Sequence, residues 1–281
     1  MAAADEVYRA PLPEGGIWSP AALERMLRIY FMQNWFNLSD PQAEDSLYDS
    51  ESMRRFAGIE LAEDTIPDES TILRFRHLLE AHDLTPGDLS GSAGFAGGEA
   101  ASVDATIIAA PPSTKNAEKA RDPEMHQTRK GKQWHFGMKA HVGTDRRGIV
   151  HSLTTTDAAA ADITQMPQLL HGEEREVFGD QAYWKEANRQ SALERGIRYR
   201  VNRRGTKKRP LTEHQRHINR CRSKARARGE HAFHVVKRLW GFSKVRYRGL
   251  AKNTARLYTA FALANLYMLR RRLLPREWCL S

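Results

Sequence analysis

Hydrophobic residues recur at helical spacing through residues 18–82. Apolar side chains return every three or four positions after Ser19-Pro20, and a serine followed by a proline is a common helix start. Asp40-Pro41 opens a second run of this kind, and Pro67-Asp68-Glu69-Ser70 precedes a third. Because Asn, Asp and Pro residues separate the runs, the pattern predicts a small all-helical N-terminal domain over residues 1–83.

The composition changes in residues 84–100. This stretch is rich in Gly, Ser and Ala and holds few bulky apolar residues, which is typical of a linker. It predicts a domain boundary, with a second domain over residues 101–281.

Hydrophobic residues of the second domain first follow the spacing of strands. Val103–Ala110 is a compact apolar run that ends at two prolines, as a buried strand can. Residues 134–142 and 149–156 alternate between polar and apolar, and Asp145–Gly148 supplies a hairpin turn between them. The polar residues 113–132 are expected to form a loop.

Shorter helical and extended patterns then alternate along the chain. The resulting order, βββαβαβα, predicts an α/β fold with a mixed sheet of the ribonuclease-H-like type. In that fold, helical crossovers add strands beside the first strand of an antiparallel meander. The expected helices cover residues 162–170, 183–196, 213–240 and 252–272, and the expected strands cover residues 176–180 and 197–201.

Charge divides the 281-residue chain at the same boundary. Residues 1–100 hold 18 acidic residues against 7 Lys or Arg, whereas residues 101–281 hold 16 against 37. Within residues 201–250 there are 16 Lys or Arg, and the only acids are Glu213 and Glu230. A basic stretch of this extent indicates a nucleic-acid partner, and a merely solvated basic surface is the alternative.

The sequence favours a cytoplasmic protein with no membrane partner. The N-terminus lacks the features of a signal peptide. The most apolar run, Leu257–Leu269, is too short to span a bilayer and is expected to form a buried helix. Cys221 and Cys279 cannot build a disulfide framework or a zinc finger.

Three acidic residues stand out by their surroundings. Asp104 lies inside an apolar strand, where an ionised carboxylate is costly without a cation or a hydrogen-bond donor. Asp180 ends a short strand after Gly179, and Glu230 lies in a strongly basic helix. Each has a simpler explanation when taken singly. Asp104 could be satisfied by hydrogen bonds from backbone N–H groups alone. Asp180 could simply begin a turn, and Glu230 could simply form a salt bridge with Arg226.

Three segments around these acids share a pattern with a known family. The segments are Val103–Ile107, Lys130–His141 and Val177–Asp180. Together with the basic helix that follows, they resemble bacterial DDE transposases of the insertion sequence 5 family. The resemblance extends over residues 18–272 and includes the stretch Pro67–Arg76.

The basic helix completes the resemblance. The family carries Tyr, Arg, Glu and Lys in that order, separated by two, three and six residues. Arg226, Glu230 and Lys237 fall at those offsets, and Ser223 stands at the Tyr position.

The resemblance implies that Asp104, Asp180 and Glu230 are the catalytic, metal-binding residues. Two Mg²⁺ or Mn²⁺ ions would be the cofactors, because hard cations prefer carboxylate oxygens. Arg226 and Lys237 would hold phosphates near the scissile bond. The implied activity is that of a DNA transposase, which hydrolyses phosphodiester bonds at transposon ends and joins the freed strands to target DNA.

Further residues are expected to contact DNA. Trp184, close after Asp180, is a candidate for stacking on an exposed base, with packing inside the fold as the simpler alternative. Basic side chains on the DNA backbone would make binding depend on salt. The predicted DNA-contact residues are Arg226, Lys237, Lys139, Arg203, Arg204, Lys207, Lys208 and Arg238.

The expected partners are double-stranded DNA, as terminal inverted repeats and as target, and a second copy of the chain. The acidic N-terminal domain suits dimerisation, with Arg74 and Arg76 as candidates for reading bases. A bacterial, nucleoid-associated location follows from the resemblance. A nuclease of the same fold without strand transfer, and a DNA-binding protein that has lost catalysis, are the alternatives.

Overall fold

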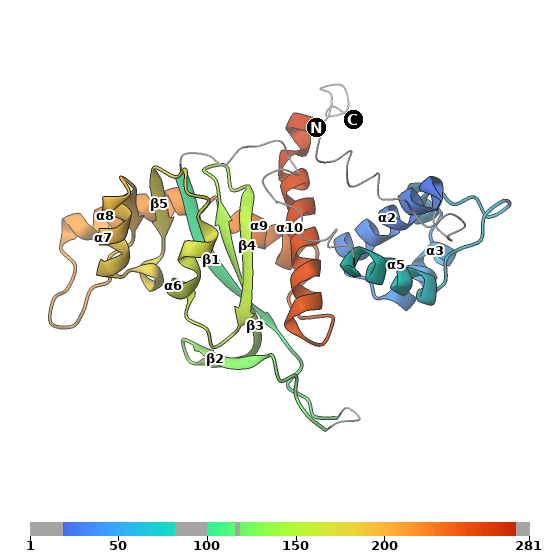
Figure 1. The fold of residues 1–281 in the computed structure, drawn as a ribbon, viewed down its shortest axis with the longest axis horizontal. Coiled ribbons are helices and arrows are strands. Elements are labelled where there is room, and N and C mark those ends of the chain that lie inside the picture. The colour runs from blue at the N-terminus through green and yellow to red at the C-terminus, as the bar shows by residue number, and fades with distance from the viewer. Residues whose placement is uncertain (1–18, 82–99, 116–118, 274–281) are drawn as a thin grey trace. The chain divides into compact units, whose positions relative to one another are not determined.

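A computed structural model describes residues 19–81, 100–115 and 119–273 of the chain (Figure 1). The predicted linker therefore lies almost entirely outside the described residues. The chain divides into two compact units, Met1–Leu79 and Glu80–Ser281.

The described part of the first unit consists of helices. Ser19 caps the first helix through a hydrogen bond from the Ala22 N–H, with Pro20 in the first turn. Ser39 and Gln42 form a capping box at the start of the second helix. Apolar faces of all four helices meet in one core, which includes Ile29, Leu47 and Phe75. The helices are α2 (Pro20–Trp35), α3 (Asp40–Asp49), α4 (Glu51–Ala57) and α5 (Glu69–Ala81).

Arg76 is part of this core rather than of an exposed surface. Its side chain is 9% exposed and donates to both carboxylate oxygens of Asp40, at 2.7 and 2.9 Å. A buried guanidinium that is paired in this way cannot reach a base without breaking the pair, which would leave a charge buried alone. The prediction that Arg76 reads bases is therefore wrong, whereas Arg74 is exposed.

The second unit is built on a six-stranded mixed sheet. β1 (Ala100–Ala109) pairs antiparallel with β3 (Gln133–Thr144), and β3 pairs antiparallel with β4 (Val150–Asp157). On the other edge of β1, β5 (Glu176–Gly179) and then β6 (Arg198–Val201) pair in parallel. The predicted mixed α/β architecture is confirmed and is consistent with a ribonuclease-H-like core.

One strand was not expected from the sequence. β2 (His126–Lys130) pairs antiparallel with the first residues of β3, so the prediction of a loop over residues 113–132 is wrong in this part. β2 has no buried residue, and its stability therefore comes from backbone pairing rather than from an apolar face. It forms a ribbon at the lower edge of the sheet in Figure 1.

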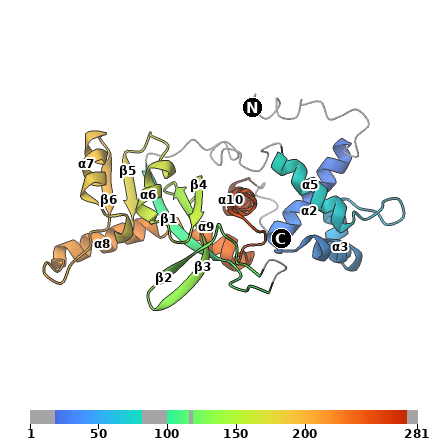
Figure 2. The same ribbon diagram turned by 60° about the horizontal axis from the view of Figure 1, so that its bottom comes forward.

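A long C-terminal helix packs against one side of this sheet. α10 (Leu250–Leu273) packs beside β4 and contains the apolar run that was expected to be a buried helix (Figure 2). The buried side chain of Asn265 exchanges two hydrogen bonds with the backbone of Val150 and fixes α10 on the strand. No described helix is long and apolar enough to cross a membrane.

A second apolar cluster lies around β5 and β6. It is formed by buried side chains that include Val103, Val177 and Tyr183. The short elements that surround it are α6 (Asp162–Gln165), η2 (Met166–Leu169), η3 (Gln181–Tyr183) and α7 (Glu186–Glu194).

Candidate active site

Asp104 lies in the middle of β1, at the centre of the sheet. Its side chain is 18% exposed, and burial raises the pKa of its carboxyl group to about 6. Arg226 and the N–H of Ala105 act in the opposite direction, because both favour the ionised form. The negative charges of Asp180 and Glu230 raise the pKa of Asp104 further.

Asp180 follows β5 directly. The parallel pairing of β1 and β5 ends at Ser102 and Phe178, and Asp104 and Asp180 each follow this pair by two residues. Asp180 also caps η3, since its Oδ1 accepts a hydrogen bond of 2.8 Å from the Ala182 N–H. Asp180 can therefore cap this turn and also belong to the candidate site.

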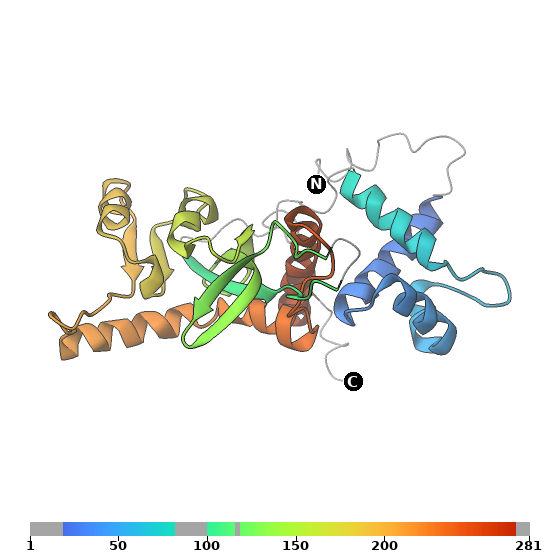
Figure 3. The same cartoon turned by 90° about the horizontal axis from the view of Figure 1, so that it is seen from below.

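Glu230 lies on a helix that is broken where the sequence predicted continuity. The expected helix over residues 213–240 is divided into α8 (Glu213–Arg226), α9 (Glu230–His234) and a π-helical turn, η4 (Val235–Leu239). Figure 3 shows α8 and α9, in orange, running end to end past the sheet.

The chain packs closely against the sheet at this break. A Cβ atom at Gly229 would lie 2.7 Å from Thr144 Oγ1 on β3 and 3.5 Å from Ser102 Oγ on β1. The backbone can approach the two strands this closely only without a side chain at that position. The close approach brings Arg226 and Glu230, on either side of Gly229, next to Asp104.

Arg226 joins two of the three acids. Its Nη1 donates to Asp104 Oδ2 at 3.0 Å, and its Nη2 donates to Glu230 Oε1 at 3.2 Å. The side chains of Arg226 and Asp104 are 17% and 18% exposed, whereas that of Glu230 is 55% exposed. The buried carboxylate therefore has a cation beside it, as its environment requires.

Lys237 approaches the same strand further along. Its ammonium group donates to Thr106 Oγ1 at 3.0 Å and to the Ile107 carbonyl at 2.8 Å. Burial lowers the pKa of Lys237, and the positive charges of Lys130 and Arg238 lower it further. The sequence signature thus places two cations, Arg226 and Lys237, along the strand that carries Asp104.

The donor set suits a hard divalent cation. Asp104, Asp180 and Glu230 offer carboxylate oxygens only, with no sulfur or imidazole among them. Within residues 19–81, 100–115 and 119–273, no three His, Cys, Asp or Glu side chains are grouped closely enough to hold a metal ion. Arg226 instead provides the positive charge between Asp104 and Glu230.

The predicted DNA-contact residues fall into two groups. Arg203, Arg204, Lys207, Lys208 and Arg209 form an exposed loop after β6, and Arg238 is also exposed. Lys139 differs, because its ammonium group binds Asp162 at 2.9 Å and the Ala160 carbonyl, and its side chain is only 12% exposed. This geometry disfavours a DNA contact for Lys139.

Trp184 packs within the fold. Its ring lies 5.8 Å from that of Tyr199, centroid to centroid, and it adds to the cluster around β5 and β6. The guanidinium of Arg203 lies 5.7 Å from the centre of the Trp184 ring. Little of the ring is therefore available for a base.

Ser223, at the position of the family's Tyr, has a structural partner. Its hydroxyl accepts a hydrogen bond of 2.9 Å from the side-chain amide of Asn202, at the end of β6. Arg222 donates to the Val201 carbonyl at 2.7 Å, so two neighbouring residues tie α8 to that strand.

The predicted DNA-contact residues do not include the exposed cations of α8. No residue of this helix is buried, and it carries five Lys or Arg but only one acid. The count of basic residues over 201–250 was the signal that pointed to them. The exposed members are Arg216, Arg220 and Lys224.

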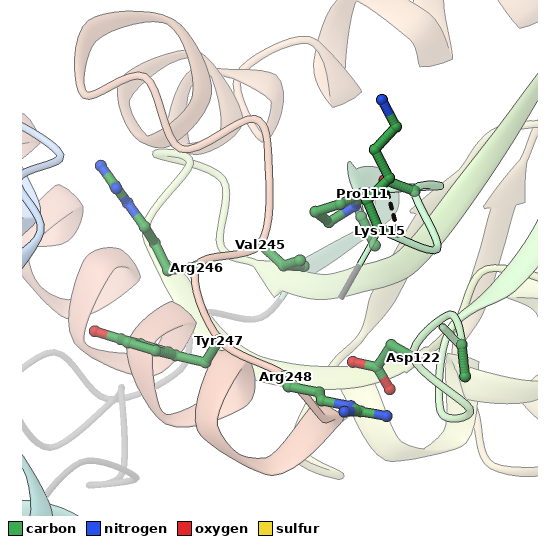
Figure 4. Close-up of a pocket in the computed structure, with 10 residues that line it drawn as sticks. Pro111, Lys115, Asp122, Val245, Arg246, Tyr247 and Arg248 are labelled. Carbon is green, nitrogen blue, oxygen red and sulfur yellow. Dashed lines mark hydrogen bonds between the residues drawn. The ribbon is translucent and has the colours of Figure 1, made fainter. Parts of the chain in front are cut away.

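An open hollow of about 390 Å³ lies away from the three acids. Figure 4 shows Arg246, Tyr247 and Arg248 on one segment of its wall, with Lys115 and Asp122 on others. Asp122 accepts a hydrogen bond from the Gly249 N–H at 2.7 Å and thereby helps to fix the start of α10. None of the three candidate catalytic acids lines this hollow.

The mixed sheet, the buried Asp104 and the exposed basic residues of the second unit suit a protein that acts on nucleic acid. The comparison with protein families agrees with this class. Residues 96–266, more than half of the chain, match the family described as "Transposase DDE domain", and residues 3–78 match "Transposase domain (DUF772)". The chain therefore belongs to the DDE transposase family and is a DNA transposase.

Proposed function

We propose that Asp104, Asp180 and Glu230 form a catalytic centre for hydrolysis at transposon ends and for strand transfer into target DNA. The observation that supports this most directly is the link from Asp104 through Arg226 to Glu230. Arg226, far away in sequence, contacts Asp104 at the middle of the sheet and joins it to Glu230. The family membership supplies the reaction class.

Divalent metal ions, Mg²⁺ or Mn²⁺, would bind to the three carboxylates and supply an activated nucleophile together with stabilisation of the leaving oxygen. Asp104, Asp180 and Glu230 would be the residues that hold the ions. Asp104 can bind a cation only when ionised, and a pKa of about 6 leaves it mostly ionised at neutral pH.

Arg226 would contact DNA from its place between two of the acids. Its guanidinium neutralises Asp104 and Glu230 and has the planar, bidentate geometry that binds a phosphate. Lys237 would contribute a point charge further along the DNA strand.

The same proposal has three further parts. They are the assignment to the insertion sequence 5 group, the division into domains over residues 1–83 and 101–281, and a working homodimer. The spacing of Arg226, Glu230 and Lys237 supports the group assignment. The two compact units support the division. A dimer would hold both transposon ends, and the acidic first unit suits protein contacts better than phosphate contacts.

A strand-transfer assay tests the proposal. The full chain is incubated with duplexes carrying the terminal repeats that flank its gene, a target plasmid, and Mg²⁺ or Mn²⁺. We expect end cleavage and joined products, both lost with a chelator or in Asp104→Asn. Glu194→Gln, which changes an exposed acid on α7, serves as the control.

Other outcomes identify the alternatives. Cleavage without joined products would identify a nuclease. DNA binding with neither cleavage nor joining would identify a non-catalytic DNA-binding protein. Joining by Asp104→Asn at the wild-type rate would remove Asp104 from the mechanism.

A further inference from the structure

The ribbon of β2 and β3 ends in a tight turn, which we call the hairpin tip and define as Arg129–Trp134. Lys130 pairs with Gln133 across a two-residue loop. Gly131 in this loop has φ +62°, the left-handed conformation that tight hairpin turns require and that glycine adopts without strain. The tip is therefore a defined structure with a fixed register.

Trp134 presents its ring to solvent at this tip. Its side chain is 66% exposed, more than any other large hydrophobic residue in the described part of the chain. Arg129 lies directly opposite in the register, and its guanidinium is 6.0 Å from the centre of the ring. This cross-strand pair holds the ring in place and leaves much of its surface free to stack.

The charge around Trp134 favours a polyanion. Residues 125–144 contain no Asp or Glu. Arg129, Lys130 and Lys132 are exposed and form no ion pair with the described residues. A bare aromatic ring among uncompensated cations is the combination that binds single-stranded nucleic acid, since every base has a face for stacking and every phosphate attracts the cations.

Lys130 links the hairpin tip to Lys237, which contacts the strand that carries Asp104. Lys130 is close enough to Lys237 for its charge to lower the pKa of that residue. Lys237 in turn binds Thr106 Oγ1, on the strand that carries Asp104 two residues earlier. A DNA strand whose phosphate is bound by Lys237 would therefore come within reach of Lys130 at the tip.

We propose that Trp134 stacks on an unpaired base of the DNA whose phosphate is held at the candidate active site. The proposal rests on the proposed function for the identity of the ligand. Trp134 takes the role that the sequence suggested for Trp184, whose ring packs against Tyr199. Stacking on the exposed ring would hold open the end of a duplex while Lys130 and Lys132 contact its backbone.

Binding to two probes tests this inference. The first probe is a blunt DNA duplex of mixed sequence, and the second is the same duplex with its last base pairs mismatched so that the bases are unpaired. Affinities of the full chain are measured by fluorescence anisotropy at one salt concentration without added metal. We expect tighter binding to the unpaired-end probe, by about 5-fold or more, because base–aromatic stacking is typically strong enough for that.

Trp134→Ala should remove the preference and keep the affinity for the blunt duplex, and Trp134→Phe should restore part of the preference. Tyr48→Ala, which removes a ring that is 59% exposed on α3, should keep the preference. The double variant Lys130→Ala, Lys132→Ala should weaken binding to both probes equally. Thermal melting checks that each variant is folded.

The inference is overturned if the wild type shows no preference, if Trp134→Ala keeps the preference, or if this variant loses affinity for both probes equally. These outcomes leave the catalytic proposal untouched, because the assay requires no chemistry. Conversely, Asp104→Asn should show the full preference for unpaired ends, so a failure of the catalytic proposal would be recognised separately.

Discussion

Arg226 determines the electrostatics of the site. A carboxylate as buried as Asp104 would resist ionisation if no positive charge lay nearby. Arg226 meets this need and also neutralises Glu230, with which it forms an i, i+4 pair on the helical segment. The same side chain thus stabilises the site before DNA binds and can contact a phosphate afterwards.

Substitutions at Arg226 and Glu230 should move the pKa of Asp104 in opposite directions. Arg226→Gln removes the neighbouring cation and should raise the pKa above about 6, whereas Glu230→Gln removes a like charge and should lower it. Carbon-detected NMR titration of the Asp104 carboxyl group in metal-free protein measures both shifts. Equal midpoints in the three proteins would show that the groups do not interact.

His141 should make the second unit sensitive to acid. The side chain is fully buried on β3, and burial lowers its pKa to about 4, with Asp162 and Lys139 acting in opposite directions. The folded pKa lies below the unfolded value of 6.5, so the unfolded state takes up the proton first as pH falls. Stability is therefore present above pH 6.5 and is lost between about 6.5 and 4.

The unfolding free energy should fall by roughly 3 kcal/mol over this pH range. The fall should be smaller in His141→Gln, because glutamine cannot take up a proton. Urea unfolding at several pH values measures it. A wild type and a variant with parallel pH profiles would contradict the assignment. Exposed His77 on α5, replaced by Gln, is the control.

At the scale of elements, the junction between α8 and α9 positions the site. Gly229→Ala would place a methyl group 2.7 Å from Thr144 Oγ1, so the helix or the Thr144 side chain must shift. We expect a loss of about 1–3 kcal/mol in unfolding free energy, typical of overpacking, and a larger relative loss of strand transfer because Glu230 moves away from Asp104.

A double variant checks the cause of that loss. Thr144→Ala removes the atom nearest to the added methyl group, so Gly229→Ala with Thr144→Ala should recover part of both stability and activity. Strictly additive losses in the double variant would show that the contact with Thr144 is not the reason.

Some elements could be predicted from the sequence and others could not. The strand around Asp104 and the helices of the first unit follow from local hydrophobic spacing, because their buried faces are encoded residue by residue. β2 has no buried face, and the break at Gly229 results from contact with strands far away in sequence. Both β2 and the break depend on contacts between distant parts of the chain, which a local hydrophobic pattern does not encode.

The site shows the same limit. The resemblance pointed to Asp104, Asp180 and Glu230 as a set, and in the structure the charges of Asp180 and Glu230 raise the pKa of Asp104. The register of β1 and β5 and the position of α9 determine which basic side chain lies next to each acid. The sequence does not reveal such pairings. Lys139 lies in a basic strand segment and was therefore predicted to contact DNA, whereas in the structure it binds Asp162.

At the scale of the whole molecule, opposite charges are concentrated in separate parts of the chain. The first 100 residues carry a net charge of −11, from 18 acids and 7 Lys or Arg, and the remainder carries +21, from 16 acids and 37 Lys or Arg. The exposed cations of α8 and of the loop after β6 contribute much of the positive charge. DNA binding should therefore belong to the second unit and depend strongly on salt.

Neutralising three cations of α8 should reduce that dependence. Each lost phosphate contact lowers the slope of log K against log salt concentration by about 0.9, so Arg216→Gln, Arg220→Gln and Lys224→Gln together should lower it by up to about 3. Anisotropy titrations over a range of salt concentrations measure the slope. Arg55→Gln, at an exposed site of the first unit, should leave it unchanged, and an equal slope in all proteins would exclude α8 from the interface.

The central claim is that three acids from three separate elements act as one catalytic unit. The most direct test compares strand transfer by Asp104→Asn, Asp180→Asn, Glu230→Gln and the triple variant, with duplex affinity measured in parallel. Each single change should reduce joining by roughly a thousand-fold or more, the triple variant should be no worse, and all should still bind DNA. Near-wild-type joining by any single variant that is folded and binds DNA would contradict the account.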